Sequence, residues 1–395
     1  MSAIPIVRAA KSLTVPAPQP TLTPDRAVRY PRIQALSPAY ARYDYSQEEV
    51  ATIMIEYMYG PNWEHDPTVA DKVKHIQRLF AASKVERRQS MIDTAAFYSR
   101  PRSTGERMAE FVPQACALGR AALEGALTTA QEDGLYADAL TDLIVVTCTG
   151  YAAPGVDILL ARDLNLPPDM RRLMIGHMGC FGGIVGLRQS LAAVQLQRLT
   201  RPQTPAAVAL LCVEITSLHW MPIEDPEVLT GYALFADAAA ALLLTDDPAA
   251  SGPELVDAYC VADFNTSDQM SWNITDNGFQ MSLSPRVPVT LRRHIETTVD
   301  HLLTPHGLRM GDVAHWLVHP GGPSILDAIQ GKLGLSDEQM ALSWRVLREH
   351  GNCSSVTILL ILDELLRSGQ AHPGEWGVLM AFGPGLTLET ALIRF

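Results

Sequence analysis

Apolar and polar positions follow two different patterns along this chain, and together they predict a mixed α/β protein. Apolar residues recur at helical spacing over residues 46–58, 68–83 and 103–131, which predicts three amphipathic helices. Continuous apolar runs at 143–148 and 207–215 have the length and composition of strands buried on both faces. Helices that alternate with buried strands indicate an α/β fold.

Shorter patterns predict further strands, a boundary and a loop. The apolar run at 173–176 predicts a buried strand, and the stretch 233–245 predicts another. The short acidic segment 246–253 contains two prolines and is the best candidate for a boundary, whereas the polar stretch 265–277 is expected to be an irregular loop. We therefore divide the chain into a loose tail (1–24), an N-terminal half (25–248) and a C-terminal half (249–395).

The second half repeats the plan of the first. In each half a buried strand is followed by a glycine- and proline-containing loop and a helix, and the chain then reaches a glycine and a polar residue at a helix start. That pair is Gly179 and Cys180 in one half, and Gly351 and Asn352 in the other. A duplicated unit would make Cys180 and Asn352 begin matching central helices, with His319 at the end of a matching strand, where α/β folds place their sites.

Three residues are candidates for chemistry. Cys180 is predicted on a tight turn at a helix start, where backbone N–H groups and the helix dipole favour a thiolate of low pKa; the alternative is a small buried apolar cysteine. His319 stands in a tight His-Pro-Gly-Gly loop at a strand end. Asn352 taken alone is equally well a helix cap. Together they form a nucleophile with an oxyanion site, a set that papain-like hydrolases also use.

Composition narrows the class of protein. The net charge of −12 over 395 residues disfavours a sequence-independent nucleic-acid binder, which needs a basic field. The six cysteines are scattered without metal-ligand spacing, and no metal, flavin or nicotinamide motif is present, so we expect reduced thiols and no cofactor. No signal-peptide pattern and no apolar run of about 20 residues is evident, so we expect a soluble cytoplasmic protein.

Five short motifs, in order, carry a family resemblance. They are Met-Gly-Cys-Phe-Gly-Gly at 178–183, Ala-Leu-Phe-Ala-Asp-Ala at 233–238, His-Pro-Gly-Gly-Pro at 319–323, Gly-Asn-Cys-Ser-Ser at 351–355 and Phe-Gly-Pro-Gly at 382–385. With these the chain resembles the type III polyketide synthases of the chalcone-synthase superfamily from about residue 50 onward. The resemblance implies a thiolase-like αβαβα layered fold built from two duplicated halves.

The resemblance also implies a reaction. Cys180 would take an acyl starter from coenzyme A, and His319 would pair with its thiolate. His319 and Asn352 would bind malonyl-CoA and stabilise the enolate that decarboxylation leaves, which then attacks the thioester on Cys180. The sequence looks closer to bacterial alkylpyrone and alkylresorcinol synthases than to plant chalcone synthases, so we expect an aliphatic starter, two or three malonyl extensions and closure to an α-pyrone or a resorcinol.

Further site residues come from the same resemblance. Phe235 matches a gatekeeper of the cavity. Met281 matches a second gatekeeper, or Phe279 does if the match to the family is shifted by two residues. The predicted cavity-lining residues are Cys148, His219 and Ser354, and the predicted coenzyme A contacts are Lys84, Arg87, Arg88, Gly321 and Gly322. The loop at Ala153 and Pro154 matches one that reaches a partner subunit, which implies a homodimer.

Two other functions stay open at this point. An initiating β-ketoacyl-ACP synthase shares the fold and the Cys, His and Asn set, but would use an acyl carrier protein. A non-catalytic acyl-binding partner of another synthase is disfavoured because all three reactive residues are present. A papain-like hydrolase is disfavoured because the cysteine lies in the middle of a duplicated α/β pattern.

Overall fold

The computed structural model describes residues 29–395, so the predicted tail at 1–24 lies outside the described residues. The strands are β1 (Arg32–Tyr40), β2 (Tyr43–Ser46), β3 (Arg87–Ser90), β4 (Asp142–Thr147), β5 (Arg171–Gly176), β6 (Ala207–Glu214), β7 (Ala238–Thr245), β8 (Glu254–Ala262), β9 (Met270–Thr275), β10 (Gly278–Leu283), β11 (Val313–Val318), β12 (Trp376–Gly383) and β13 (Thr387–Arg394). The helices are α1 (Gln47–Tyr59), α2 (Ala70–Ala82), α3 (Thr94–Phe97), α4 (Thr104–Glu132), α5 (Val156–Asp163), α6 (Gly182–Thr200), α7 (Pro226–Leu234), α8 (Val287–Leu303), α9 (Pro323–Leu333), α10 (Asp337–His350) and α11 (Thr357–Ser368).

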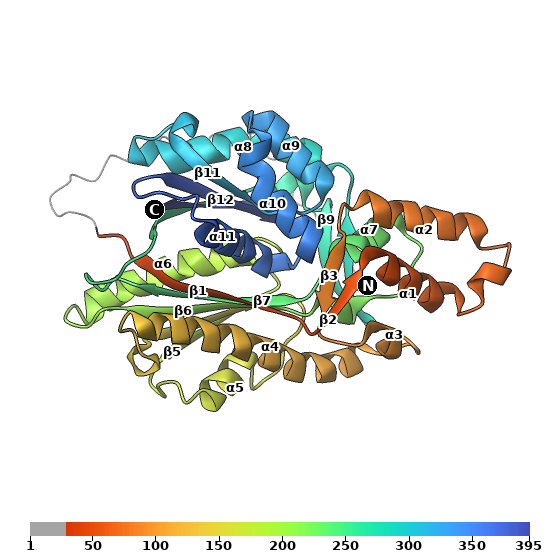
Figure 1. Cartoon of the computed structure of the whole chain (residues 1–395), viewed down its shortest axis with the longest axis horizontal. Coiled ribbons are helices and arrows are strands. Elements are labelled where there is room, and N and C mark those ends of the chain that lie inside the picture. The colour runs from red at the N-terminus through yellow and green to blue at the C-terminus, as the bar shows by residue number, and fades with distance from the viewer. Residues whose placement is uncertain (1–28) are drawn as a thin grey trace, which may run out of the picture.

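The elements stack in five layers, as Figure 1 shows. Helices α4 and α5 cover the outer face of one sheet, α6 and α11 lie between the sheets, and α8 and α9 cover the other outer face. Among the described residues nine strands are hydrogen-bonded in the order β11-β12-β13-β8-β1-β7-β6-β4-β5, and β1 meets β8 only at Arg32 and Glu254. The array therefore behaves as two sheets joined at one residue pair, which is the predicted thiolase-like αβαβα fold.

The two halves repeat each other, as the sequence predicted. In the first, β4 runs parallel to β6, and β6 and β1 both pair antiparallel with β7. In the second, β11 runs parallel to β12, and β12 and β8 both pair antiparallel with β13. Within residues 29–395, only the first half has an edge strand such as β5. In its place the second half has α10 and a single parallel bridge between Asn352 and Phe235, which ties the two halves together.

The central helices bring the two halves into contact at their starts. Both are surrounded by apolar side chains, because each is covered by sheet on both sides (Figure 1). A Cβ atom on Gly183 would lie 2.4 Å from the carbonyl oxygen of Ser355, just before α11. Only glycine allows this approach, and it places the turns that precede α6 and α11 side by side.

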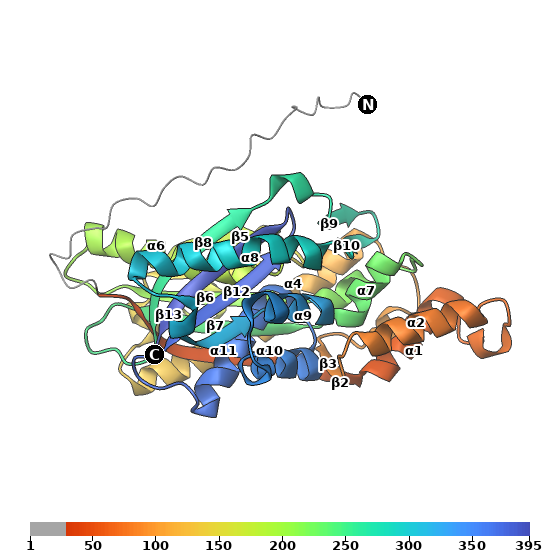
Figure 2. The same cartoon turned by 90° about the horizontal axis from the view of Figure 1, so that it is seen from above.

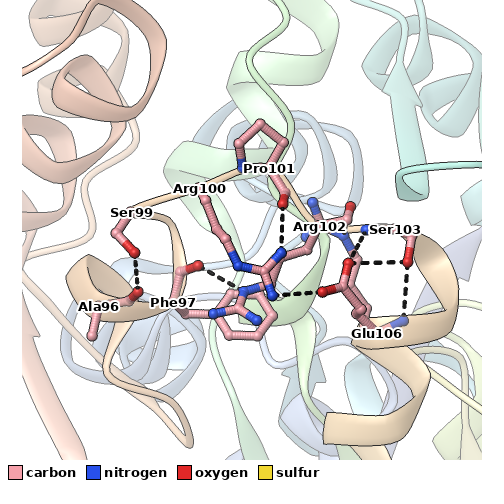
Figure 3. A network of polar contacts seen from close by, with 9 residues as sticks. Ala96, Phe97, Ser99, Arg100, Pro101, Arg102, Ser103 and Glu106 are labelled. Atoms are coloured by element: carbon pink, nitrogen blue, oxygen red, sulfur yellow. Dashed lines mark hydrogen bonds and ion pairs between the residues drawn. The ribbon is translucent and has the colours of Figure 1, made fainter.

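The start of α4 holds the β9–β10 hairpin (Figure 2). Ser103 caps α4 in a capping box with Glu106, and Arg100 donates a hydrogen bond to the same carboxylate (Figure 3). The next residue, Thr104, donates its backbone N–H to the carbonyl of Asp276 at the hairpin turn, at 2.8 Å. The hairpin, which carries residues of the site, is thus anchored to a rigid helix start.

Three predicted segments differ from the structure. The strand at 173–176 exists but is an edge strand, and Leu173 is 42% exposed rather than buried. Residues 233 and 234 end helix α7 instead of beginning a strand, because Asp225 caps that helix and Pro226 occupies its first turn. The stretch 265–277 contains strand β9, whose polar side chains are accommodated because one face of the hairpin is uncovered. Within the described residues no helix is long and apolar enough to cross a membrane.

Candidate active site

Cys180 lies on the turn between β5 and α6 and is 6% exposed. The preceding Gly179 has a φ of +80°, and a Cβ atom there would lie 2.5 Å from the ring of Pro384. The turn therefore requires glycine at this position. It presents the thiol to a closed space between the halves, as the strand–turn–helix pattern predicted.

The amide of Asn352 faces this thiol. Its Oδ1 and Nδ2 atoms each lie 3.9 Å from Cys180 Sγ. Oδ1 also accepts the backbone N–H of Ser354 at 2.8 Å, which fixes which side of the amide carries the oxygen. The thiol can donate to Oδ1, and a thiolate can accept from Nδ2, so Asn352 serves both protonation states without moving.

His319 completes the group from the end of β11. Its backbone N–H donates to Met380 on β12 at 2.9 Å, and its side chain lines one cavity with Cys180 and Asn352. The side chain is fully buried, and neither ring nitrogen has a hydrogen-bond partner. A buried imidazole without partners is costly, since such nitrogens are nearly always hydrogen-bonded. This free hydrogen-bonding capacity lies in the wall of the cavity that Cys180 also lines.

Burial dominates the titration of this group. It raises the pKa of the Cys180 thiol to about 12, and hydrogen bonds from Ser354 and Asn352 offset only part of the effect. Burial also lowers the pKa of His319 to about 3. The low thiol pKa predicted from the helix start is therefore not found, because desolvation outweighs it. Both groups are neutral at pH 7, and a thiolate forms only if a neighbour such as His319 takes the proton.

Phe235 and Met281 stand at the junction of two small cavities. Both side chains, with Cys180, line the cavity of His319 and Asn352 and also an inner cavity that contains Cys148 and Ser354. A gatekeeper role for these two residues, as predicted from the sequence, would require such a position. Phe279, the alternative second gatekeeper, is fully buried and lines neither cavity, so the geometry favours Met281.

The inner cavity has members that the sequence identified and one that it missed. Cys148 accepts the backbone N–H of Gly179 at 3.0 Å, and the Ser354 hydroxyl lies 4.0 Å from the Cys148 sulfur. Burial, and next the charge of Glu214, raise the pKa of Cys148 well above its ordinary value. Trp272 also lines this cavity. It was missed because it lies in a stretch expected to be irregular, although the alternation of Met270, Trp272 and Ile274 is a strand signal.

His219 does not line either cavity, contrary to the prediction. Its ring is 1% exposed and lies behind the cavity wall, with Nε2 2.7 Å from the carbonyl of Thr149. Its Nδ1 accepts the backbone N–H of Phe279 at 3.1 Å. These contacts define the neutral tautomer with the proton on Nε2, and burial lowers the pKa of His219 to about 3.

A larger pocket of 670 Å³ opens to solvent beside the His319 cavity, and the two share Leu234, Leu283, Gly321 and Ile325 as walls. The predicted coenzyme A contacts Gly321 and Gly322 line this mouth, and Lys84 is an exposed residue next to its wall residue Ser83. The prediction that Arg88 contacts coenzyme A is wrong, because its guanidinium is buried and donates hydrogen bonds to the carbonyls of Tyr232 and Phe235.

Three further basic residues lie near the mouth of this pocket or on the strand after it: Arg87 on β3, and His75 and Arg78 on helix α2. Arg87 is exposed and bound to Asp44 at 2.5 Å on the neighbouring strand. On α2, Leu79 and Ala82 line the mouth, and the spacing of a helix puts His75 and Arg78 on the same side one turn earlier. His75 and Arg78 were not among the predicted coenzyme A contacts, because the sequence alone does not show which face of α2 borders a pocket.

The chain matches two family models that follow each other, "Chalcone and stilbene synthases, N-terminal domain" over residues 38–248 and "Chalcone and stilbene synthases, C-terminal domain" over residues 256–395. It is 32% identical to a 3,5-dihydroxyphenylacetyl-CoA synthase of Streptomyces toyocaensis over 375 residues, which are 92% of this chain and 90% of that protein.

Solved structures agree with the family models. The structure of PKS-I from the brown alga Ectocarpus siliculosus aligns with a TM-score of 0.84 and 26% identity, covering 94% of this chain and 99% of that one. A type III pentaketide synthase of Neurospora crassa aligns with a TM-score of 0.81 and shows the same fold, at 24% identity over 92% of this chain and 99% of that one. Together with the sequence matches, these similarities confirm the predicted family: the chain belongs to the chalcone and stilbene synthase family and is a type III polyketide synthase, an acyltransferase of the condensing kind.

Proposed function

We propose that Cys180 carries the growing acyl chain and that His319 and Asn352 drive decarboxylation of the extender. One observation carries this assignment. A fully buried imidazole without hydrogen-bond partners lines the same cavity as a buried thiol and an oriented amide. Such an imidazole can form a hydrogen bond with a thiolate or with a substrate carbonyl that enters the cavity.

Loading is a transfer of the acyl group between two sulfurs. The thiol proton of Cys180 passes to His319, and the two charges then offset each other's desolvation. The thiolate attacks the carbonyl of an acyl-CoA, forming a new carbon–sulfur bond. Coenzyme A leaves as its thiolate and takes the proton back from His319.

Extension uses the other two residues as hydrogen-bond donors. Type III polyketide synthases use acyl-CoA and malonyl-CoA as substrates. When malonyl-CoA loses CO₂, the electron pair of the broken bond forms an enolate, whose oxygen accepts hydrogen bonds from His319 and from Nδ2 of Asn352. The enolate carbon attacks the thioester on Cys180, and the Cys180 thiolate is released. Transfer of the lengthened chain back to Cys180 begins another round.

We assign the phosphates of coenzyme A to the rim of the mouth. Arg78 and Lys84 are exposed basic side chains on and just after α2, beside the mouth residues Ala82 and Ser83. Basic side chains there suit the phosphate groups, while the apolar mouth suits the pantetheine arm. Arg78→Ala should raise KM for acyl-CoA with little change in kcat; an unchanged KM at low salt would contradict this placement.

We also propose that two copies of the chain form a homodimer through the edge strand β5. This strand ends the sheet, and apolar side chains around it are exposed: Leu173 at 42%, Ile158 at 41%, Met178 at 39% and Tyr151 at 52%. An open apolar edge is a usual site of strand pairing. The loop with Ala153 and Pro154 lies between Tyr151 and Ile158 in the chain. Sedimentation at micromolar concentration should give twice the monomer mass, and Leu173→Lys should shift it toward the monomer.

For the product we propose an aromatic or lactone ring of the resorcinol or α-pyrone type. The name of the Streptomyces relative describes a 3,5-dihydroxyphenyl group, which is a resorcinol ring, joined to an acetyl-CoA unit. Mass spectrometry of products formed from malonyl-CoA with and without added starters would identify the ring and the number of extensions.

The test of the assigned roles separates loading from decarboxylation. Cys180→Ala should abolish condensation, a loss of about 10⁶-fold as for other deleted nucleophiles, but should still release CO₂ from malonyl-CoA. Asn352→Ala should lose decarboxylation first. Loss of CO₂ release in a folded Cys180→Ala variant would show that the division of roles is wrong, and product formed only with an acyl carrier protein would favour an initiating synthase.

A further inference from the structure

Arg88 on β3 is a buried cation that donates its hydrogen bonds to neutral groups. The residue is 3% exposed, and its acceptors are the carbonyls of Tyr232 and Phe235 and Oε1 of Gln47, at 2.6, 2.7 and 2.8 Å. Burial lowers the pKa of Arg88 to about 9, and the charge of Asp237 counters only part of this effect, so the side chain is still charged at pH 7. Burying a charge costs free energy, and the hydrogen bonds that Arg88 makes must offset that cost.

The carbonyls that Arg88 binds belong to the end of helix α7. The last carbonyls of a helix have no partner inside it, and here the four carbonyls at 232–235 are bound from outside. Arg88 Nη1 binds the first and the last of them. The side-chain amide of Gln47 donates to the second at 2.7 Å, and the backbone N–H of Asn352 donates to the third at 2.8 Å. The positive charge of Arg88 also suits this negative end of the helix dipole.

The same helix end is joined to the backbone of Asn352. Phe235 and Asn352 form a parallel bridge, the link between the two halves of the fold. The carbonyl of Leu234 accepts the N–H of Asn352, and the carbonyl of Asn352 accepts the N–H of Ala236 at 3.0 Å. Asn352 is therefore held on both sides by the segment that Arg88 and Gln47 hold in turn.

Gly351 leaves no free space in this joint. Its φ is +69°, and a Cβ atom there would lie 2.7 Å from the carbonyl oxygen of Leu234 and 3.7 Å from Cβ of Arg88. Because the backbones are packed this closely, a shift of the helix end moves Asn352 as well. Arg88 can thus affect where the amide of Asn352 lies, although it has no contact with the substrate cavity.

We propose that Arg88 is a positioning residue for the reaction, which fixes the end of α7 so that the amide of Asn352 is correctly placed for the enolate oxygen. The inference rests on the proposed role of Asn352 in decarboxylation. A misplacement of about 1 Å can slow a reaction by about 10²-fold. The binding of malonyl-CoA along the mouth should change little, because Arg88 does not line the mouth.

The experiment is a double-mutant cycle on CO₂ release from malonyl-CoA. Arg88→Met removes the charge and the hydrogen bonds, and should lower kcat by about tenfold to 10²-fold with KM nearly unchanged. In the Asn352→Ala background the same substitution should lower kcat by less than about twofold, since the amide that Arg88 positions is absent. A residue that only supports the fold would cause equal losses in both backgrounds.

A matched control and a conservative variant accompany the cycle. Arg107 is also buried, at 1% exposed, but it donates to the backbone carbonyls of Arg102 and Leu218. Arg107→Met should lower the free energy of unfolding in urea and leave kcat of the folded protein within about twofold. Arg88→Lys keeps a cation but loses the planar group, so its kcat should lie between those of Arg88→Met and the unmodified protein. It also serves as the test if Arg88→Met does not fold.

The outcomes differ for the two levels of the argument. Equal losses in the two backgrounds, or an unchanged kcat in folded Arg88→Met or Arg88→Lys, would overturn the proposal. A higher KM for malonyl-CoA with unchanged kcat would also overturn it, because Arg88 would then act in binding coenzyme A. Unchanged CO₂ release in Asn352→Ala alone would instead refute the proposed role of Asn352.

Discussion

The region around His319 and the region around His219 contain the same side chain in almost the same state, yet they do different things. Both imidazoles are buried, and burial lowers the pKa of each to about 3. His219 has a partner at each nitrogen, whereas His319 has a partner at neither. Neither burial nor pKa therefore separates the wall from the reaction centre. The unused hydrogen-bonding capacity does: His319 has it and His219 does not, and in the proposed mechanism a substrate atom supplies the missing partner.

The largest effect is expected when each histidine is replaced in a separate variant. His319→Ala removes a donor to the enolate oxygen and should slow malonyl-CoA decarboxylation by about 10²- to 10³-fold. His219→Gln keeps a donor and an acceptor and should leave that rate nearly unchanged. Initial rates of CO₂ release decide the matter, and similar losses in both variants would remove the distinction drawn here.

For the free energy of unfolding the order should be reversed, so that replacing His219 has the larger effect. His219→Ala leaves the carbonyl of Thr149 and the N–H of Phe279 without partners, at a cost of about 1–3 kcal/mol for each group. His319→Leu removes two buried nitrogens that have no partner and should leave the free energy of unfolding unchanged or raise it. Urea unfolding of both variants measures this, and a large loss for His319→Leu would argue that His319 is structural.

The pH dependence of stability gives the smallest effect. The folded pKa of each histidine is depressed to about 3 from 6.5, so on acidification below pH 6.5 the unfolded chain binds a proton that the folded chain does not. Stability should therefore fall with pH, by about 1.4 kcal/mol per pH unit for each histidine once well below pH 6.5. His219→Gln should have a shallower slope between pH 6.5 and 5; an unchanged slope would mean that His219 is charged in the folded protein.

The sequence was sufficient for the parts of the site that lie on strong local patterns. The glycines around Cys180, the loop at His319 and the helix start after Asn352 marked the three candidate residues, and the repeat of the two halves predicted that they would meet in one cavity. These features depend on backbone geometry, which short motifs encode.

What the sequence did not provide depends on the environment of each side chain. Arg88 and Arg87 are adjacent in a basic run, but only the structure shows that one is buried and the other exposed. The pKa of Cys180 was predicted from the helix start alone, and burial reversed its direction. Trp272 lay in a stretch whose polar side chains hid a strand, since the strand is covered on one face only.

Strand β13 has a consequence for how the enzyme is made. Among the described residues it is the last strand in chain order, yet it lies between β12 and β8 inside the sheet, and the backbone of β12 accepts the N–H of His319. A ribosome making this protein must therefore finish residues 387–394 before the second sheet can close. During synthesis the Cys180 thiol is already present, but its proton acceptor is not yet in place. The nascent chain should be inert toward acyl-CoA until residues 387–394 have been made and have paired in the sheet.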